Sequence, residues 1–227
     1  MSERLFDRSE RYDDMLQMGL DLSGEDKHYF IHGRLADLRR QLRADWAPRR
    51  ILDFGCGGGA TSAALAELFA GAEVVGTDVC DPALQEAAAR HSSDRVTFCL
   101  ASAIPNAGWF DLCYVNGAFH HIEPRARPAA LATIHRSLRA GGYLALFENN
   151  PWNPGARLVM HRIPFDRDAR MLRPATTRRL VREAGFTEVR ATRSLFYFPR
   201  SLARLRTLEP CLSRLPLGAQ YYVLARR

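Results

Sequence analysis

Long apolar runs are missing from this 227-residue sequence. No stretch approaches the roughly 18 consecutive apolar residues that a transmembrane helix needs. The opening stretch, MSERLFDRSERYDDM, carries too many charges for a secretory signal peptide. We therefore expect a cytoplasmic protein with no membrane partner.

Cysteine is sparse and shows no pairing pattern. The sequence has five cysteines, an odd number, and none of them forms a C-x-x-C pair. This pattern argues against a disulfide framework and against a cysteine-based zinc site. We interpret the cysteines as small residues of the hydrophobic core.

Lysine is almost absent, and Lys27 is the only one in the sequence. The formal net charge is nevertheless +7. The arginines that supply this charge are spread over expected helix faces, such as RLADLRRQLR and TTRRLVREAG. Scattered arginines of this kind indicate a solvated surface more than a basic patch. The sequence therefore predicts no nucleic-acid partner.

What the sequence does contain is a regular alternation of apolar strands and helical segments from Arg49 onward. Apolar runs of about four to eight residues separated by helical periods are typical of a parallel sheet covered on both faces. The pattern predicts strands at 50–54, 73–78, 95–99, 110–116 and 142–148, helices at 59–70, 82–90 and 125–139, a further helix from 174, and two β-rich runs at 187–198 and 219–227.

Two segments interrupt or precede this alternation. Residues 1–46 show no strand and predict a helical extension or lid, with Ser23 and Asp26 at the spacing of a capping box. Residues 47–227 then form the main domain. Within it, prolines and a glycine interrupt any regular period over about 149–172, so we expect an irregular insertion there.

A glycine-rich loop follows the first strand in RRILDFGCGGGA. Glycines permit positive φ angles and let the backbone approach a ligand closely, and the next helix turns its first amides toward that ligand. GCGGGA also satisfies the G-x-G-x-x-A pattern of dinucleotide-binding proteins, with Asp78 as the ribose acceptor. A dinucleotide-dependent oxidoreductase is therefore one hypothesis.

Asp53 argues for a different ligand. It stands two residues before Gly55, where a carboxylate would repel a pyrophosphate. The same charge would suit a ligand with an ammonium or sulfonium group. The loop therefore favours a cationic ligand.

The order of motifs strengthens this interpretation. The segments ILDFGCGGG, VVGTDVCDP, FDLCYVNGAFHHI and IHRSLRAGGYLALFE, taken together, resemble the class I S-adenosylmethionine-dependent methyltransferases. The resemblance covers residues 49 to about 197 and the final strand. It implies an α/β three-layer sandwich with a seven-stranded, mostly parallel sheet and an antiparallel last strand. It also implies S-adenosylmethionine as cofactor and S-adenosylhomocysteine as product, without a metal.

The resemblance assigns cofactor contacts residue by residue. Asp78 is expected to accept both ribose hydroxyls. Ser102 stands where many members carry an acid for the adenine, so either Ser102 and backbone groups read the adenine or the correspondence is out of register there. The other expected contacts are Asp53, Gly55 and Gly57 beneath the methionine part, Ala101 beside the adenine, and Asn116 facing the methyl donor.

Candidate catalytic residues follow the fourth and fifth strands, at the edge where open α/β sheets bind ligands. His120 and His121 come just after the fourth strand, and Glu148 ends the fifth. A histidine there can act as a base near neutral pH, although packing or hydrogen bonding is the alternative role. The expected substrate contacts are Tyr12, His28, Asn149, Asn150 and Trp152.

A metal site has little support in the sequence. His28 and His32 are one helical turn apart, but the glutamate of H-E-x-x-H and a third ligand are missing. The adjacent His120 and His121 of HHIE stand at a strand–loop junction where the sequence shows no partner ligand. We therefore expect a methyltransferase acting on a small-molecule acceptor, at oxygen first and nitrogen second, in secondary metabolism or in a modified-sugar or quinone-like pathway. The alternatives are an NAD(P)-dependent oxidoreductase and a non-catalytic protein that binds S-adenosylmethionine.

Overall fold

The predicted sheet is confirmed in a computed structural model, which describes residues 12–105, 108–167, 169–190 and 192–227, without the side chains of residues 12–15. The sheet has seven strands in the order β3-β2-β1-β4-β5-β7-β6. Their bounds are β1 Arg50–Phe54, β2 Glu73–Asp78, β3 Val96–Leu100, β4 Phe110–Asn116, β5 Leu138–Asn149, β6 Arg193–Leu195 and β7 Gln220–Arg226.

Strand direction follows the expected pattern. β1 to β5 run parallel, whereas β7 pairs antiparallel with both β5 and β6. The antiparallel last strand is therefore confirmed, and it is inserted between β5 and β6. The predicted β-rich run at 187–198 contributes only the three residues of β6.

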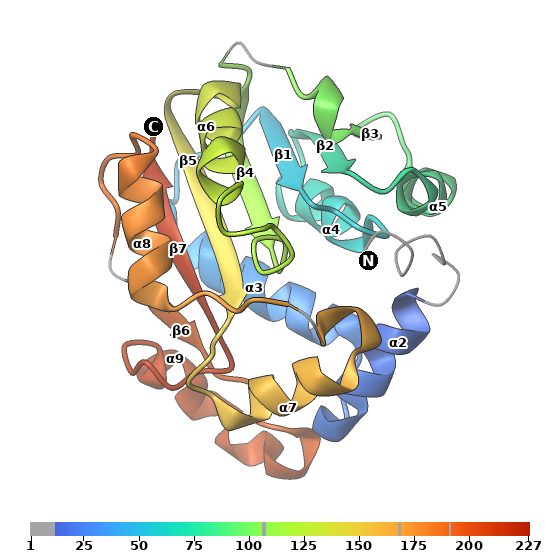
Figure 1. Ribbon diagram of the computed structural model, residues 1–227, viewed down its shortest axis with the longest axis vertical. Helices are drawn as coiled ribbons and strands as arrows, with labels where there is room; N and C mark the ends of the chain where they lie inside the picture. The colour runs from blue at the N-terminus through green and yellow to red at the C-terminus, as the bar shows by residue number, and fades with distance from the viewer. Residues whose placement is uncertain (1–11, 106–107, 168, 191) are drawn as a thin grey trace.

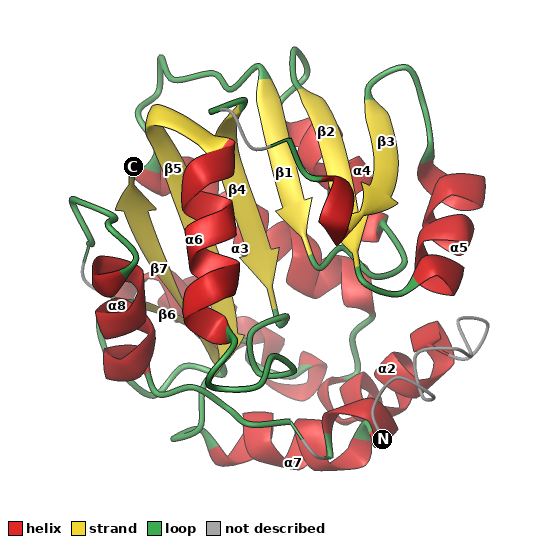
Figure 2. Ribbon diagram, turned by 45° about the horizontal axis from the view of Figure 1, so that its top comes forward, coloured by secondary structure: helices red, strands yellow, loops and turns green. Residues whose placement is uncertain are grey.

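Helices cover both faces of the sheet, which explains why the strands read as near-continuous apolar runs. Figure 2 shows α6 and α8 in front of the strands, with α3 and α4 behind them. Leu38 and Leu65 pack behind the sheet in one core cluster, and Leu131 and Val181 pack in front in the other. These helices are α3 Lys27–Gln41, α4 Ala60–Leu68, α6 Arg127–Ser137 and α8 Pro174–Glu183, while α5 Asp81–His91 packs beside β3.

The remaining helical segments gather beyond the carboxyl ends of the parallel strands. Figure 1 shows α2 and α7 there, and the two helices contact each other. Of the described residues, no helix is long and apolar enough to cross a membrane. The segments are α2 Tyr12–Leu20, η2 Asp21–Ser23, η3 Ala101–Ala103, α7 Pro154–Arg162, η4 Pro164–Asp166, η5 Arg200–Leu208 and α9 Glu209–Leu212.

The expectation of an irregular segment at 149–172 is wrong, because α7 and η4 lie within it. Asn153 caps α7 by accepting a hydrogen bond from the Ala156 amide at 2.8 Å, and Pro154 follows at the first helical position. Proline costs a helix nothing there, since the first amides have no partner within the helix. Two of the prolines that interrupted the expected period, Pro154 and Pro164, stand at helix starts.

The prediction of a capping box at Ser23 and Asp26 is also wrong, because Ser23 is not the N-cap residue of α3. Asp26 itself is the N-cap of α3 and accepts from the Tyr29 amide at 3.0 Å. Ser23 donates instead to the Leu20 carbonyl at 2.6 Å. Among the cysteines, which are all free, Cys113 is buried as expected but Cys211 is exposed.

Candidate functional site

The glycine loop between β1 and α4 has a backbone path that needs glycine. Gly55 and Gly59 have φ angles of 76° and 79°, in the left-handed region. A Cβ atom added at Gly55 would lie 2.7 Å from the Cβ atom of Ala118. The loop therefore leaves bare backbone beside the carboxyl ends of β1 and β4.

Asp78 ties this loop to the end of β2. Its Oδ2 atom accepts from the Gly57 amide at 3.0 Å, and its Oδ1 atom accepts from the amides of Val79 and Cys80 at 2.8 and 3.0 Å. A carboxylate offers about four acceptor positions, so Oδ2 retains capacity for a hydroxyl group. Asp78 is thus a turn residue and a possible ligand contact at once.

Asp53 is a buried acid at the start of the loop, with 2% of its surface exposed. Its Oδ2 atom accepts a hydrogen bond from the Ser62 hydroxyl at 2.7 Å. Burial raises the pKa of Asp53 to about 7, with the charge of Asp78 adding to the rise and the Ser62 bond and Arg34 opposing it. A bound cation would favour the ionised form of this carboxyl group.

Arg34 on α3 is a site residue that the sequence did not reveal. Its guanidinium donates to the Tyr114 hydroxyl and to the Gln220 side-chain oxygen, both at 3.1 Å, and only 6% of the residue is exposed. Both partners are neutral, and Arg34 has no salt bridge with the described residues. The sequence of its helix is rich in arginine and was interpreted as a solvated face. The burial of Arg34 could therefore not be predicted.

The glycine loop, Asp53 and Arg34 meet at one cavity of about 690 Å³, a volume typical of small-molecule sites. Asn116 contributes a buried Oδ1 atom that has no hydrogen-bond partner among the described residues. The cavity brings together seven residues predicted from the sequence, namely Asp53, Gly55, Gly57, Asn116, His120, His121 and Asn149. Arg34 lines it as well.

The other predicted site residues lie outside the described lining of this cavity. Asn150 is fully buried and donates to the carbonyls of Pro216 and Gly218 at 2.9 and 2.8 Å, so it braces the wall. Trp152 is 49% exposed, and His28 and Ser102 are exposed. The ligand roles of Asn150, Trp152, His28 and Ser102 stay predictions. The same holds for Asp78, Ala101 and Glu148. The side chain of Tyr12 lies outside the described part of the chain.

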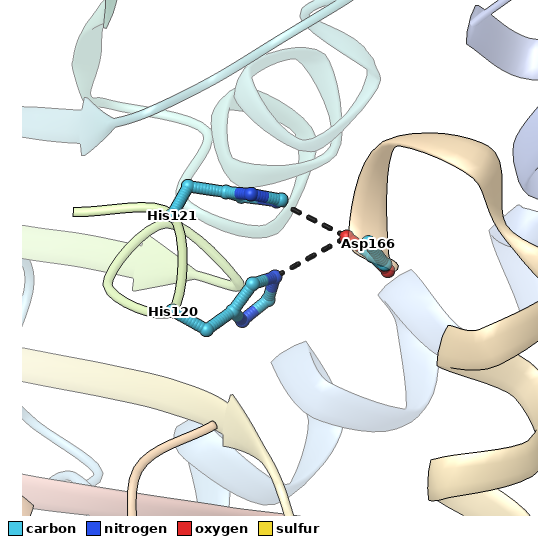
Figure 3. Close-up of side chains that lie close together, drawn as sticks. All are labelled: His120, His121 and Asp166. Carbon is cyan, nitrogen blue, oxygen red and sulfur yellow. Dashed lines mark ion pairs between the residues drawn. The ribbon is translucent and has the colours of Figure 1, made fainter. Parts of the chain in front are cut away.

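Three polar side chains that line the same cavity, His120, His121 and Asp166, lie close together (Figure 3). The His120 Nδ1 atom lies 2.7 Å from Oε2 of Glu148, whose Oε1 accepts from the Phe119 amide at 2.8 Å. The Nε2 atoms of His120 and His121 lie 3.4 and 3.1 Å from the same oxygen, Oδ1 of Asp166. We call His120, His121 and Asp166 the histidine–aspartate cluster.

The charges around His120 argue against its role as a base. Burial alone would lower the pKa of His120, but the charge of Glu148, together with Asp166, raises it to about 10. An imidazolium must lose its proton before Nε2 can act as a base or bind a metal ion. His121 is the more accessible histidine, with 25% of its side chain exposed against 3% for His120.

Asp166 belongs to η4 and is the second site residue missed from the sequence. It lies in the segment expected to be irregular, far along the chain from the histidines, and no motif marks it. Arg127 fixes the arrangement by donating to the carbonyls of Phe119 and Arg170, and the Arg170 amide donates to the His120 carbonyl at 2.9 Å. The loops that carry the cluster are thereby joined.

Comparison with known proteins agrees with this geometry. Residues 51–142 match the family model described as a methyltransferase domain. A ubiquinone biosynthesis O-methyltransferase from Aromatoleum aromaticum is 30% identical over 172 residues, covering 63% of this chain and 69% of the relative. The chain belongs to the class I S-adenosylmethionine-dependent methyltransferases.

Further relatives support the same family. A demethylmenaquinone methyltransferase from Thermus thermophilus is 35% identical over 142 residues, covering 58% of this chain and 64% of the relative, so just under two thirds of that protein is matched. A solved S-adenosylmethionine-dependent methyltransferase from Mesorhizobium loti shares the fold at a TM-score of 0.62 and 22% identity, covering 86% of this chain and 98% of the other. The family assignment favours a methyl donor over a dinucleotide as the ligand of the glycine loop.

Proposed function

We propose that this protein transfers the methyl group of S-adenosylmethionine to a small-molecule acceptor, at oxygen first and nitrogen second. One observation carries the proposal: the glycine loop with Asp53 and the histidine–aspartate cluster line one and the same cavity. A donor site and a proton-accepting wall are thus within one enclosure. We also propose that the reaction takes place in the cytoplasm and belongs to secondary metabolism. Residues 1–46 are proposed to act as a lid over the cavity.

The charges of the cavity fit the amino-acid end of the donor, which carries an ammonium and a carboxylate. Asp53 and the Oδ1 atom of Asn116 offer acceptors for the cationic groups. Arg34 offers a buried cation whose partners are neutral, which suits the carboxylate. The bare backbone at Gly55 leaves the space that a side chain would fill.

The acceptor side is largely apolar. Four apolar side chains line the same cavity, and one of them, Phe165 of η4, lies against His121. The others are Phe30 of α3, Val159 of α7 and Ile163, which follows α7. A compact acceptor with an apolar body and one ionisable hydroxyl fits such a wall. The names of the ubiquinone and demethylmenaquinone relatives favour a quinone-like molecule.

When bound, S-adenosylmethionine supplies a methyl group already activated by its sulfonium. The work left to this chain is to position the acceptor, exclude water and receive the hydroxyl proton. Glu148 and Arg127 hold the loop after β4 in place, and the histidine–aspartate cluster presents its polar atoms to the cavity. Methyl transfer then depends chiefly on orientation.

Donor affinity is expected to depend on pH through Asp53. Its pKa is raised to about 7, so near pH 6 only about a tenth of the molecules carry the charge that attracts the cationic donor. Affinity for S-adenosylmethionine should therefore fall about tenfold between pH 7.5 and pH 6, as measured by calorimetry. Over this range the amino group of the donor, with an α-amino pKa of about 7.7 to 8.0, stays mostly protonated.

Asp53→Asn is the control for this pH effect. The variant keeps a side chain that can bond to Ser62 but cannot ionise, so its affinity should be low and flat across the same range. An unchanged slope in Asp53→Asn would show that another group controls the pH dependence.

Turnover tests the proposed reaction itself. Purified protein is incubated with S-adenosylmethionine and a panel of hydroxylated quinols, phenols and aromatic amines, and release of S-adenosylhomocysteine is measured. We expect acceptor-dependent release with one or more hydroxyl compounds. Tight donor binding without turnover on a broad panel would favour the alternative of a non-catalytic S-adenosylmethionine-binding protein.

A further inference from the structure

The histidine–aspartate cluster brings one carboxylate oxygen against two imidazole rings. Oδ1 of Asp166 lies within 3.4 Å of the Nε2 atoms of both histidines, as ion pairs that do not reach hydrogen-bond geometry. Asp166 is only 7% exposed, so water cannot compensate this oxygen freely. The two rings and the carboxylate converge from two separate loops, as Figure 3 shows.

We propose that the Nε2 atoms of His120 and His121 and Oδ1 of Asp166 form a site for one divalent first-row transition-metal ion. All three atoms lie within 4.8 Å of one another. Metal bonds of roughly 2.0 to 2.2 Å place adjacent ligand atoms about 3 to 3.5 Å apart, which matches the two separations measured from Asp166. A shared ion would be bound by the carboxylate oxygen and both rings together.

The surroundings of the cluster resemble those of metal-binding histidines. Such a histidine usually directs its second ring nitrogen to a carboxylate, which fixes the tautomer that leaves the other nitrogen available. His120 does this through Nδ1, 2.7 Å from Glu148, and its Nε2 faces Asp166. Glu148 is completely buried and is held by the Phe119 amide.

The composition of the cluster indicates the class of ion. Two imidazoles and one carboxylate suit zinc, iron and similar ions, whereas magnesium and calcium prefer sites made of oxygen alone. Three protein ligands leave positions open for another ligand, and all three residues line the cavity. If the proposed methyl transfer is correct, an acceptor oxygen is the natural occupant, because a bound metal makes a hydroxyl more acidic.

The sequence pointed away from a metal because it showed no third ligand. The two histidines are adjacent in the chain, and adjacency gives no ligand geometry without a partner from elsewhere. Asp166 supplies that partner only once η4 packs beside the loop after β4. We expected a metal-free site because the sequence does not show that Asp166 lies beside the two histidines.

Titration of the metal-free protein with Co²⁺, followed by visible absorption, tests the proposal directly. We expect one Co²⁺ per chain with ligand-field bands, displaced by Zn²⁺. Asp166→Ala and His121→Ala should each weaken Co²⁺ binding at least tenfold. His32→Ala combined with His161→Ala removes two exposed histidines outside the cavity lining and should leave binding unchanged.

Circular dichroism checks the fold of each variant. If an alanine variant fails to fold, Asp166→Asn takes the place of Asp166→Ala and His121→Gln takes the place of His121→Ala. The proposal is overturned if the wild-type protein binds no Co²⁺ up to millimolar concentration. It is equally overturned if binding survives the cluster substitutions or disappears in the His32 and His161 variant. Calorimetry with S-adenosylhomocysteine on the same samples reports the donor site separately, so loss of the metal proposal leaves the proposed function testable.

Discussion

Asp78→Ala is expected to weaken binding of S-adenosylmethionine by roughly two to three orders of magnitude. A carboxylate that accepts hydrogen bonds from ribose hydroxyls makes charge-assisted bonds of about 1.5 to 3 kcal/mol each. The structure adds a second reason, because Asp78 also holds the Gly57 amide and thus the glycine loop. Calorimetric titration of the purified variant measures the effect.

Asp81→Ala is the matched control for this substitution. Asp81 lies three positions further on, is exposed, and bonds only to the Gln85 side chain of its own helix among the hydrogen bonds described. Its replacement should leave donor affinity within a factor of two or so of the wild-type value. If Asp78→Ala lowers the melting temperature while the folded fraction binds normally, Asp78 is only a turn residue.

Removal of one cluster residue should produce the largest effect on rate. His121→Ala and Asp166→Ala are each expected to lower kcat by about 10² to 10⁴-fold, the usual contribution of a group that assists deprotonation of the acceptor, either by taking the proton or by holding a metal ion that acidifies the hydroxyl. Donor affinity should change little, because the proposed donor contacts are the glycine loop and Asp53, and neither replaced residue is among them. Steady-state kinetics with an acceptor found in the turnover panel separates kcat from KM.

His161→Ala is the control for the rate effect. His161 lies exposed in the last turn of α7 and outside the described lining of the cavity, so kcat should stay at the wild-type level. Asp166→Asn should recover part of the packing but little of the rate, since an amide cannot receive the proton. Near-normal kcat in both cluster variants would assign them a structural role and leave catalysis to positioning.

Much of the fold could be predicted because its determinants are local. The apolar runs of β1, β2 and β4 match the predicted bounds, since a strand buried on both faces reads as an apolar run of strand length. The glycine loop was equally readable, because positive φ at Gly55 and Gly59 needs glycine. Asp53 followed from its place one residue before the end of β1.

The parts that escaped prediction depend on contacts between distant segments. Arg34 looks like any other arginine of its helix until Tyr114 and Gln220 enclose it. Asp166 becomes part of the site only through the packing of η4 against the loop after β4. Helix α7 was hidden because prolines are ambiguous: they end a helix from within but begin one when a cap such as Asn153 precedes them.

The central claim is that the glycine loop with Asp53 forms a site for S-adenosylmethionine. Calorimetric titration of the wild-type protein, with S-adenosylmethionine, S-adenosylhomocysteine, NADH and NADPH in parallel, tests this most directly. The account predicts micromolar binding of the first two ligands at one site per chain and far weaker binding of both dinucleotides. Preferential binding of NADH or NADPH would contradict it.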